Sequence, residues 1–450
     1  MPTEWTEMAL GELCLKITDG SHSSPPSVPF GKPMASVKDL TPFGLDLKDA
    51  RNISIFDYDL LVKQECQPKV GDVLIAKDGN SALDTTCLVK EPLSVVLLSS
   101  VAILRPNPKK LLPEYLKQYL SSPETISYLK SEFISGGVIP RVILKDFKRA
   151  VVKLPSIREQ RRIAHILGTL DDKIENNRKT AKTLEAMAQA IFQSWFVDFD
   201  PVRAKMAGES KESICKRLKL TPEILDLFPD RLVDSELGEI PEGWGNVPFS
   251  ECVTIIGGGT PKTSVLEYWD GNIPWFSIVD APIGDGIWVV DTEKKISESG
   301  LNNSSTRILP IGTTIITARG TVGRVAIVGV PMAMNQSCYG LRGKYDELGF
   351  FTHFSTRLII KELRQHAHGS VFDTITRDTL ESIEVTLPPA GIIDWFERTI
   401  SLPMERLKQY SEETQIVTML RDTLLPKLIS GETRVPEAEH FMETVMNGKA

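Results

Sequence analysis

The strongest constraint on this 450-residue sequence is that its second half repeats its first. The stretch "EWTEMALGELCLKITDGS" matches "GWGNVPFSECVTIIGGGT" at a displacement of 239 residues, and "PMASVKD" matches "PWFSIVD" at 241. Further on, "GGVIPRVILKDFKRAVVKLPS" matches "GSVFDTITRDTLESIEVTLPP" at 233. A displacement that changes only by small insertions and deletions is typical of a duplicated domain. The chain is therefore expected to contain two copies of one domain, the second beginning near residue 240.

Both copies show the same order of local patterns. Short β-branched runs such as "DVLIA" and "TTIITA", separated by Gly, Pro and Asn, indicate strands. Helical patterns follow at "PEYLKQYLSSPETISYLKSEF" and "FFTHFSTRLIIKELRQHA". Each copy then ends in "LP" and a long helical pattern. The predicted fold class is α+β: two similar globular α/β domains, each followed by a long helix.

The two long helical patterns each carry an apolar seam at heptad a and d positions. The first seam consists of Ile163, Leu167, Leu170, Ile174, Asn177, Ala181, Leu184, Ala188, Ile191 and Trp195. The second, displaced by 233, consists of Phe396, Ile400, Pro403, Leu407, Tyr410, Thr414, Val417, Arg421, Leu424 and Leu428. Because a globular domain separates two seams of equal length, we expect the helices to pack together as an antiparallel coiled coil. The alternative is that each helix only covers its own domain.

Composition excludes several classes of protein. An apolar fraction of 41% with 25% charged residues is typical of a soluble folded chain, and no apolar run is long enough to cross a bilayer. The six cysteines are scattered, so neither disulfides nor a structural metal are expected. We expect a cytoplasmic protein without a membrane or metal site. The net charge of −7 argues against a surface coated in positive charge, although basic side chains outnumber acidic ones between residues 100 and 153.

No catalytic or cofactor motif is present. The stretch "IIGGGTPKT" lacks the spacing of a phosphate-binding loop and aligns with "ITDGSHSSPP", so its glycines more simply permit close approach of backbone segments. The Asn-Pro-Pro-aromatic motif of amino-methyltransferases and their glycine-rich loop are absent as well. We therefore expect no catalytic residues and no cofactor in this chain.

Polar and basic side chains recur in corresponding loops of the two copies. The first copy has Ser21, His22, Lys77, Asp78, Asn80, Ser81 and Arg141, and the second has Thr260, Lys262, Arg319, Thr321, Arg324, Asn335 and Gln336. Such side chains suit DNA base edges, with Arg or Lys on guanine and Asn or Gln on adenine. Their identities differ between copies while the framework repeats, which favours recognition of two different sequences. The alternative is a duplicated-domain coiled-coil scaffold with solvated loops and no DNA reading.

Three stretches carry a resemblance to a known family. "LPSIREQRRIAHILGTLDDKIENNRKTAKTLEAMAQAIFQSWFVDFDPVRAKM", "FPDRLVDSELGEIPEGW" and "LLPKLISGETRV" closely resemble the specificity (S) subunits of Type I restriction-modification enzymes, HsdS. The resemblance implies target recognition domains at 1–154 and 241–388, each followed by a spacer helix at 155–200 and 389–432. A connecting segment at 201–240 and a C-terminal tail at 433–450 complete the chain.

The resemblance also implies a function. In that family the S subunit is not catalytic; it binds double-stranded DNA at a bipartite site and holds two modification (M) subunits, which carry S-adenosylmethionine and methylate adenine. Two restriction (R) subunits, which use ATP and Mg²⁺, can join. A spacer of about 50 Å would place the half-sites roughly one DNA turn or slightly more apart. Trp195, Phe196 and Phe199 are expected to anchor a partner, and "LPPAGIIDWFERTI" departs from the usual "LPPLxEQ".

Overall fold

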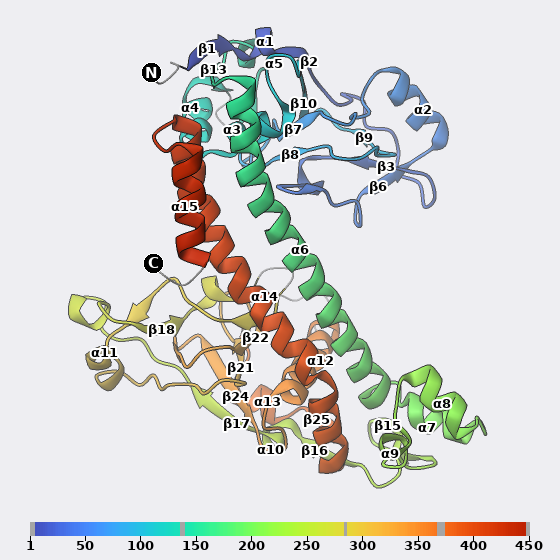
Figure 1. Ribbon diagram of the computed structural model, residues 1–450. Helices are drawn as coiled ribbons and strands as arrows, with labels where there is room; N and C mark the ends of the chain where they lie inside the picture. Colours follow the sequence, from blue (N-terminus) through green and yellow to red (C-terminus); the bar gives the residue numbers. More distant parts are fainter. Residues whose placement is uncertain (1–4, 136–139, 283–285, 367–373, 447–450) are drawn as a thin grey trace. The chain divides into compact units, whose positions relative to one another are not determined.

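The computed structural model describes residues 5–135, 140–282, 286–366 and 374–446. The chain divides into two compact units, of which unit 1 combines Met1–Glu175 with Gln415–Ala450 and unit 2 is Asn176–Thr414. Two long helices, α6 (Ile157–Phe196) and α14 (Ala390–Ser430), each contribute one half to each unit (Figure 1). Each unit therefore contains one copy of the repeat and a pair of half-helices. None of the helices in the described part of the chain is long and apolar enough to span a membrane.

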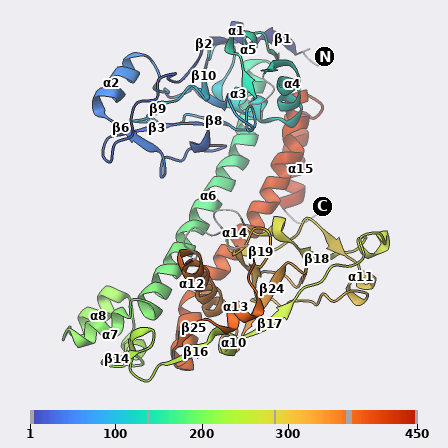
Figure 2. The same cartoon turned by 180° about the vertical axis from the view of Figure 1, so that it is seen from behind.

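In unit 1 the central sheet has the order β2-β10-β7-β8, with antiparallel neighbours. Its strands are β2 (Cys14–Asp19), β7 (Val73–Ala76), β8 (Thr86–Leu88) and β10 (Val101–Pro106). A smaller sheet of β6 (Arg51–Ile53), β3 (Lys32–Ala35) and β9 (Val96–Leu97), with α2 (Ile55–Lys63), lies on the side away from α6 (Figures 1 and 2). The remaining elements are β1 (Thr6–Ala9), α1 (Leu10–Leu13), β4 (Leu40–Thr41), β5 (Gly44–Leu45), α3 (Pro113–Ser121), α4 (Pro123–Phe133), β11 (Ile134–Ser135), β12 (Arg141–Val142), α5 (Leu144–Phe147) and β13 (Val151–Leu154).

Unit 2 repeats this plan with the order β17-β24-β21-β22-β19. The strands are β17 (Val253–Gly257), β19 (Trp288–Val289), β21 (Thr314–Thr317), β22 (Val325–Val328) and β24 (Cys338–Gly343). A smaller sheet contains β20 (Lys295–Ile296), β18 (Ile273–Phe276) and β23 (Ala333–Met334). The remaining domain elements are β16 (Gly245–Pro248), α10 (Phe249–Cys252), α11 (Glu298–Asn302), α12 (Phe350–His366), α13 (Arg377–Glu381) and β25 (Glu384–Leu387). The pairings β1 with β13 and β16 with β25 close the two domains in the same way.

The two copies agree in local detail as well as in strand order. Ser36 and Asp39 form a capping box around a single 3-10 turn, and Ser277 and Asp280 form the same box 241 residues later. In both boxes the carboxylate accepts a 2.7 Å hydrogen bond from the backbone N–H of the serine. This local agreement supports the duplication inferred from the sequence.

The glycines just before and just after β7 recur around β21. Gly71 and Gly312 have φ of +87° and +82°, and Gly79 and Gly320 have φ of +91° and +76°. Only glycine adopts this left-handed region without strain, so the same turns are built in both copies. The hairpin that these glycines shape carries several of the predicted DNA contacts.

The predicted packing of the long helices on each other is confirmed in each unit. In unit 1 the buried seam residues Ile163, Leu167, Leu170 and Ile174 of α6 join Val417, Leu424 and Leu428 of α14 in one core. In unit 2, Ala181, Ala188 and Trp195 join Phe396, Ile400 and Leu407. These cores also contain domain residues, so each half-helix pair packs both on itself and on its own domain.

Polar contacts along the seam show that the helices are antiparallel. In unit 2, Asn177 donates a 2.9 Å hydrogen bond to Glu413. In unit 1, Arg421 donates to Asp171 across 3.3 Å. Partner numbers fall on α14 as they rise on α6, which defines the antiparallel direction. The irregular seam position Arg421 is thus explained by a buried carboxylate on the opposite helix.

Each copy's first tryptophan packs against the end of the long helix that follows the other copy. The Trp5 ring would lie 3.2 Å from a Cβ added at Gly431, directly after α14. Trp244 packs at a centroid distance of 6.1 Å on Phe196, the last residue of α6. A residue larger than glycine at 431 would meet the Trp5 ring, and its φ of +80° favours glycine.

Two regions contain more structure than the sequence indicates. The expected connecting segment forms α7 (Asp200–Met206), α8 (Lys211–Leu218) and α9 (Pro222–Leu225), followed by the hairpin β14 (Leu232–Ser235) and β15 (Gly238–Pro241). The expected tail contains α15 (Val435–Met446), whose Val435 and Ala438 are buried in the unit 1 core.

Candidate nucleic-acid interface

In unit 1 the predicted contact residues gather at one edge of the central sheet. The C-terminal ends of β2 and β7 both flank the start of β10, where Asp19 pairs with Ala102 and Ala76 with Val101. The chain at residue 141 reaches the same edge through an isolated bridge to residue 78. Three segments that are far apart in the sequence are thereby brought together. We call this edge, with the segments 19–22, 77–81 and 141–142, the unit 1 loop edge.

Two of the predicted residues there have structural roles. Lys77 is buried, and its Nζ lies 2.6 Å from Asp19 Oδ2, so its charge is already neutralised within the domain. Ser21 is also buried; its hydroxyl donates to the Ser23 carbonyl and accepts from the Ser23 N–H. Lys77 therefore has an ion-pair role and Ser21 a turn role within the domain, and both side chains are buried.

The other four predicted residues of unit 1 are exposed at this edge. Asn80 and Ser81 lie in the hairpin between β7 and β8. His22 Nε2 lies 3.2 Å from Asp19, and Arg141 Nε lies 3.2 Å from Asp78 Oδ1. Asp78 belongs to the polar loop residues noted in the sequence, whereas Asp19 was not singled out, because its partner Lys77 lies 58 residues away.

Unit 2 has the equivalent edge. Gly257 of β17 pairs with Tyr339, and Thr317 of β21 pairs with Cys338, so the same two strand ends flank the start of β24. Residue 319 forms an isolated bridge to residue 374. We call this edge, with the segments 258–262, 318–324, 335–337 and 374–375, the unit 2 loop edge.

Most predicted residues of unit 2 are exposed there. Arg319 and Thr321 lie in the hairpin between β21 and β22, and Lys262 lies in the loop after β17. Thr260 donates a hydrogen bond to the Gln336 side-chain carbonyl, which joins two of the loops. Hydroxyl, amide and guanidinium groups are thus presented side by side along one edge.

Arg324 and Asn335 are less accessible. Arg324 lines a cleft with Glu185 of α6 and Arg357 of α12, and Arg357 is paired with Glu185 at 2.5 Å. Asn335 is half-buried, and its Oδ1 accepts a 3.0 Å hydrogen bond from Ser337 N–H. Arg324 therefore lies on the side of the hairpin that faces the long helix, while Asn335 shapes its own turn.

The glycine-rich loop after β17 packs against the domain. A Cβ added to Gly258 would lie 1.9 Å from the Asn335 carbonyl oxygen, and one at Gly259 would lie 2.3 Å from Ser305 Oγ. Trp275 Nε1 donates to the Gly259 carbonyl across 3.0 Å. These glycines permit close backbone approach, which agrees with the interpretation of the sequence and leaves no open cradle for a phosphate.

The three aromatic residues expected to anchor a partner are buried within unit 2. Trp195, Phe196 and Phe199 are all less than 9% exposed. Phe199 packs on Trp244 at 5.6 Å, and Trp195 packs on Phe228 at 5.5 Å. The expectation that these side chains are surface anchors needs correction, because residues 199–244 fold back over the end of α6 and bury them.

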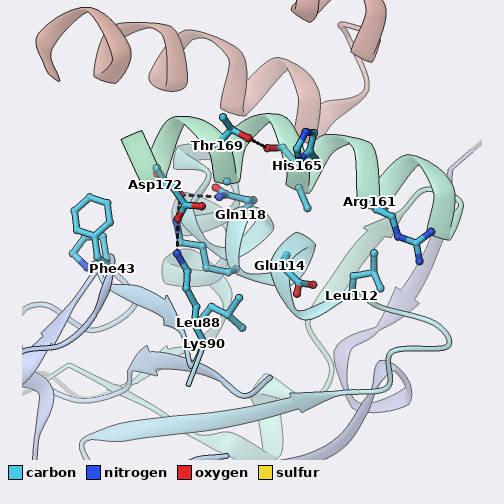
Figure 3. Close-up of a pocket in the computed structure, with 15 residues that line it drawn as sticks. Phe43, Leu88, Lys90, Leu112, Glu114, Gln118, Arg161, His165, Thr169 and Asp172 are labelled. Atoms are coloured by element: carbon cyan, nitrogen blue, oxygen red, sulfur yellow. Dashed lines mark hydrogen bonds and ion pairs between the residues drawn. The ribbon is translucent and has the colours of Figure 1, made fainter. Parts of the chain in front are cut away.

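A cleft of about 540 Å³ lies in unit 1 away from the loop edge. Figure 3 shows Arg161, His165, Thr169 and Asp172 along α6, opposite α3 and the end of β8. Leu88, at the end of β8, pairs with Val73 at the start of β7, so the cleft is at the opposite end of the sheet from the loop edge. The cleft therefore does not extend the candidate DNA contact.

The buried charges of Asp171 and Lys117 at this cleft are paired with each other. Asp171 accepts hydrogen bonds from Lys117 at 2.5 Å and Gln118 at 2.7 Å. Burial alone would raise the pKa of Asp171, but the adjacent Lys117 ammonium and these hydrogen bonds outweigh it and lower that pKa. Asp171 thus stays ionised and acts as a structural partner. Within the described ranges no group of three or more His, Cys, Asp or Glu side chains could hold a metal ion.

Comparison with known proteins gives a consistent result. Residues 2–186 and 241–418 match the family described as the Type I restriction modification DNA specificity domain. The Type I restriction enzyme HindI specificity subunit of Haemophilus influenzae is 29% identical over 373 residues, which cover 75% of this chain and 81% of that protein. The putative type I restriction enzyme MjaX specificity subunit of Methanocaldococcus jannaschii is 20% identical over 97% of this chain and 95% of its own length.

A solved structure shares the fold. The S subunit of a Type I restriction-modification system from M. genitalium superposes with a TM-score of 0.57. The alignment covers 95% of this chain and 96% of that one, at 15% sequence identity. The duplicated α+β architecture with long helices is thus shared over nearly the whole chain.

Proposed function

Because the chain belongs to the family of Type I restriction-modification DNA specificity subunits, we propose that its two domains each read one half of a bipartite DNA site. As a specificity subunit it is not itself catalytic. The observation that carries the proposal is that each unit gathers its exposed polar loop residues at the same edge of the same sheet, with different side chains in the two copies.

The recognition domains of this proposal are residues 1–154 and 241–388, and the spacers are 155–200 and 389–432. In the first domain His22, Asn80, Ser81 and Arg141 are the proposed DNA contacts. In the second they are Thr260, Lys262, Arg319, Thr321 and Gln336. Arginine and the amide side chains supply the donor and acceptor pairs that distinguish base pairs in the major groove.

The proposed partners follow from the family. Two M subunits that carry S-adenosylmethionine would perform adenine methylation, and two R subunits would supply ATP- and Mg²⁺-dependent restriction. This chain would then bring its partners to a chosen sequence. The net charge of −7 fits such a division, since the partners would provide most contacts with the phosphate backbone.

A scaffold that does not read DNA is the alternative function. On that reading the exposed loops would have no role in recognising a DNA sequence, although their side chains differ between two copies that share one strand framework. Family membership as a DNA specificity subunit favours reading over scaffolding alone.

Methylation profiling of the complex formed with its M subunits tests the proposal. We expect a bipartite motif in which Arg319→Ala changes only one half, because a lost bidentate base contact costs about 1 to 3 kcal/mol of discrimination. The exposed Arg307→Ala, in a loop of the same unit, serves as the control. A motif that is continuous, or that changes in both halves with Arg319→Ala, would contradict the assignment.

A further inference from the structure

The two loop edges share one backbone pairing with different side chains. In unit 1, Val142 N–H donates to the Lys77 carbonyl at 3.0 Å, beside the bridge between Asp78 and Arg141. In unit 2, Ile375 N–H donates to the Ala318 carbonyl at 2.9 Å, beside the bridge between residues 319 and 374. These positions correspond at the same displacements of 241 and 233 that relate the two copies in the sequence.

In the first copy, acidic and basic side chains alternate in a row beside this backbone pairing. Asp19 contacts Lys77 at 2.6 Å, Lys77 lies 3.9 Å from Asp78, and Asp78 contacts Arg141 at 3.2 Å. The side chains of Asp19, Lys77 and Asp78 are only 13%, 6% and 13% exposed, whereas that of Arg141 is 64% exposed. A largely buried ion-paired group therefore holds one exposed guanidinium at the edge.

Among the described residues of the second copy there is no such row of charges. The positions equivalent to Asp19 and Lys77 are Gly258 and Ala318, which carry no charge. Residue 319 is the exposed Arg319, and the residue across the bridge is Thr374. The arginine thus comes from the opposite side of the same bridge, and the residue that it faces across the bridge is a threonine in place of a charged partner.

We infer that this bridge is a specificity-determining pair in both domains, with Arg141 the base-reading residue of the first, Asp78 its positioning residue, and Arg319 the base-reading residue of the second. The inference rests on the proposed function and deepens it. The hydrogen bond from Nε to Asp78 orients the Arg141 guanidinium, and the Nη1 and Nη2 edge is the one that suits guanine O6 and N7. Holding the fork in advance lowers the entropy lost on binding.

Substitution of Asp78 should have an effect on DNA binding that substitution of a phosphate-binding or purely structural residue would not have. Removing its negative charge makes the edge more attractive to the DNA backbone, so overall DNA affinity should rise or stay level. Discrimination by Arg141 should nevertheless fall, because the guanidinium is no longer held in one plane. In Asp78→Asn we therefore expect specificity to fall without any loss of overall DNA affinity.

The test uses the complex of the full chain with its M subunits and a DNA library randomised at both half-sites. Arg141→Thr, which imitates the second copy, should lose roughly 5- to 150-fold discrimination at one position of one half-site. Asp78→Asn should lose part of the discrimination at that same position. The double variant should be no worse than Arg141→Thr, because Asp78 acts through Arg141.

The control is Arg149→Thr, since Arg149 is an exposed arginine paired with Asp146 at 2.8 Å. Residues 148 and 150 bond to α1, at the other end of β2 from Asp19, so this arginine is remote from the loop edge. Arg149→Thr should leave the motif unchanged. Melting temperatures of all variants establish that the changes in the motif do not arise from unfolding.

Three outcomes overturn the inference. Arg141→Thr could weaken every sequence alike and reduce the salt dependence of binding by about one phosphate, which would make Arg141 a phosphate contact. Asp78→Asn and Arg141→Thr could change discrimination at different positions of the half-site, or their losses could add in the double variant. Either result would show that Asp78 does not act through Arg141. A parent complex without a bipartite motif would overturn the proposed function and this inference together.

Discussion

At the scale of single residues, one buried glutamic acid side chain, Glu397, takes the place of a motif that the second spacer lacks. In unit 1, Gln160 of α6 accepts a hydrogen bond from Leu112 N–H at 2.9 Å, directly before α3. In unit 2, Glu397 of α14 accepts from Leu348 N–H at 3.0 Å and Phe351 N–H at 2.8 Å, at the start of α12. Both side chains join a long helix to its domain, so the departure from "LPPLxEQ" is compensated one helical turn later.

Glu397 should make the stability of unit 2 depend on pH. Burial, with a smaller contribution from the Asp346 carboxylate, raises the pKa of Glu397 to about 8 against the opposing N–H donors. Between pH 4.5 and 8 the folded state then holds a proton that the unfolded state has lost. The unfolding free energy should fall as pH rises, by at most about 1.4 kcal/mol per pH unit, and level off above pH 8.

Denaturant unfolding at several pH values checks this expectation. Glu397→Gln should remove most of the slope between pH 5 and 8, because the neutral amide cannot ionise. Glu405→Gln, at an exposed position of the same helix, should keep the slope. An unchanged slope in Glu397→Gln would show that another group is responsible.

The predicted site residues show what a sequence can and cannot decide at this scale. Arg141, Asn80 and Arg319 were singled out because polar residues in matching loops differ between copies, and their contact with DNA stays a prediction. Lys77 looked equivalent to them, but its partner Asp19 lies on a neighbouring strand 58 residues away, and only the fold reveals the ion pair. A buried lysine and an exposed lysine have the same sequence signature.

At the scale of elements, periodicity predicted the long helices well. It could not show whether a helix continues through a residue that normally breaks it. Pro403 lies inside α14, where a missing N–H normally breaks a helix. The helix continues because Ile400, Met404 and Leu407 around it are fully buried. Tertiary packing of one apolar face therefore outweighs the local cost.

Truncating a side chain of the seam to alanine should lower the unfolding free energy more, the more deeply that side chain is buried. Leu167 is 0% exposed within the unit 1 core, so Leu167→Ala should lower the unfolding free energy by about 2 to 5 kcal/mol. Met187 lies on the same helix but is 52% exposed, and Met187→Ala should change stability by about 0.5 kcal/mol or less. Equal effects in chemical denaturation would contradict the seam.

The end of α6 should behave as core and not as an anchor. Phe196 packs on Phe351 and Phe396 at centroid distances of 5.1 Å each, so Phe196→Ala should cost about 3 to 5 kcal/mol in the isolated chain. Phe30, which is 93% exposed, provides the matched control Phe30→Ala with little effect on unfolding. A fully stable Phe196→Ala chain with weakened partner binding would instead restore the anchor role.

At the scale of the whole molecule, the duplication was predictable because its displacement is nearly constant along the chain. The division into units was not, because heptad phase does not show where along two long helices one compact unit ends. Unit 1 is built from both ends of the chain, and unit 2 is one continuous segment. The core of unit 1 consequently depends on residues more than 240 positions apart, such as Leu167 and Leu424.

This arrangement predicts that fragments of the chain differ in their ability to fold on their own. Residues 176–414 contain all of unit 2 and should unfold cooperatively when expressed alone. Residues 1–175 alone lack the buried Val417, Leu424 and Val435 of their own core, so they should melt at a lower temperature and expose apolar surface. Adding residues 415–450 as a separate peptide should restore the transition, since the peptide supplies the missing α14 half and α15. A fragment 1–175 whose melting did not respond to the peptide would show that the domain is complete without the second half of α14.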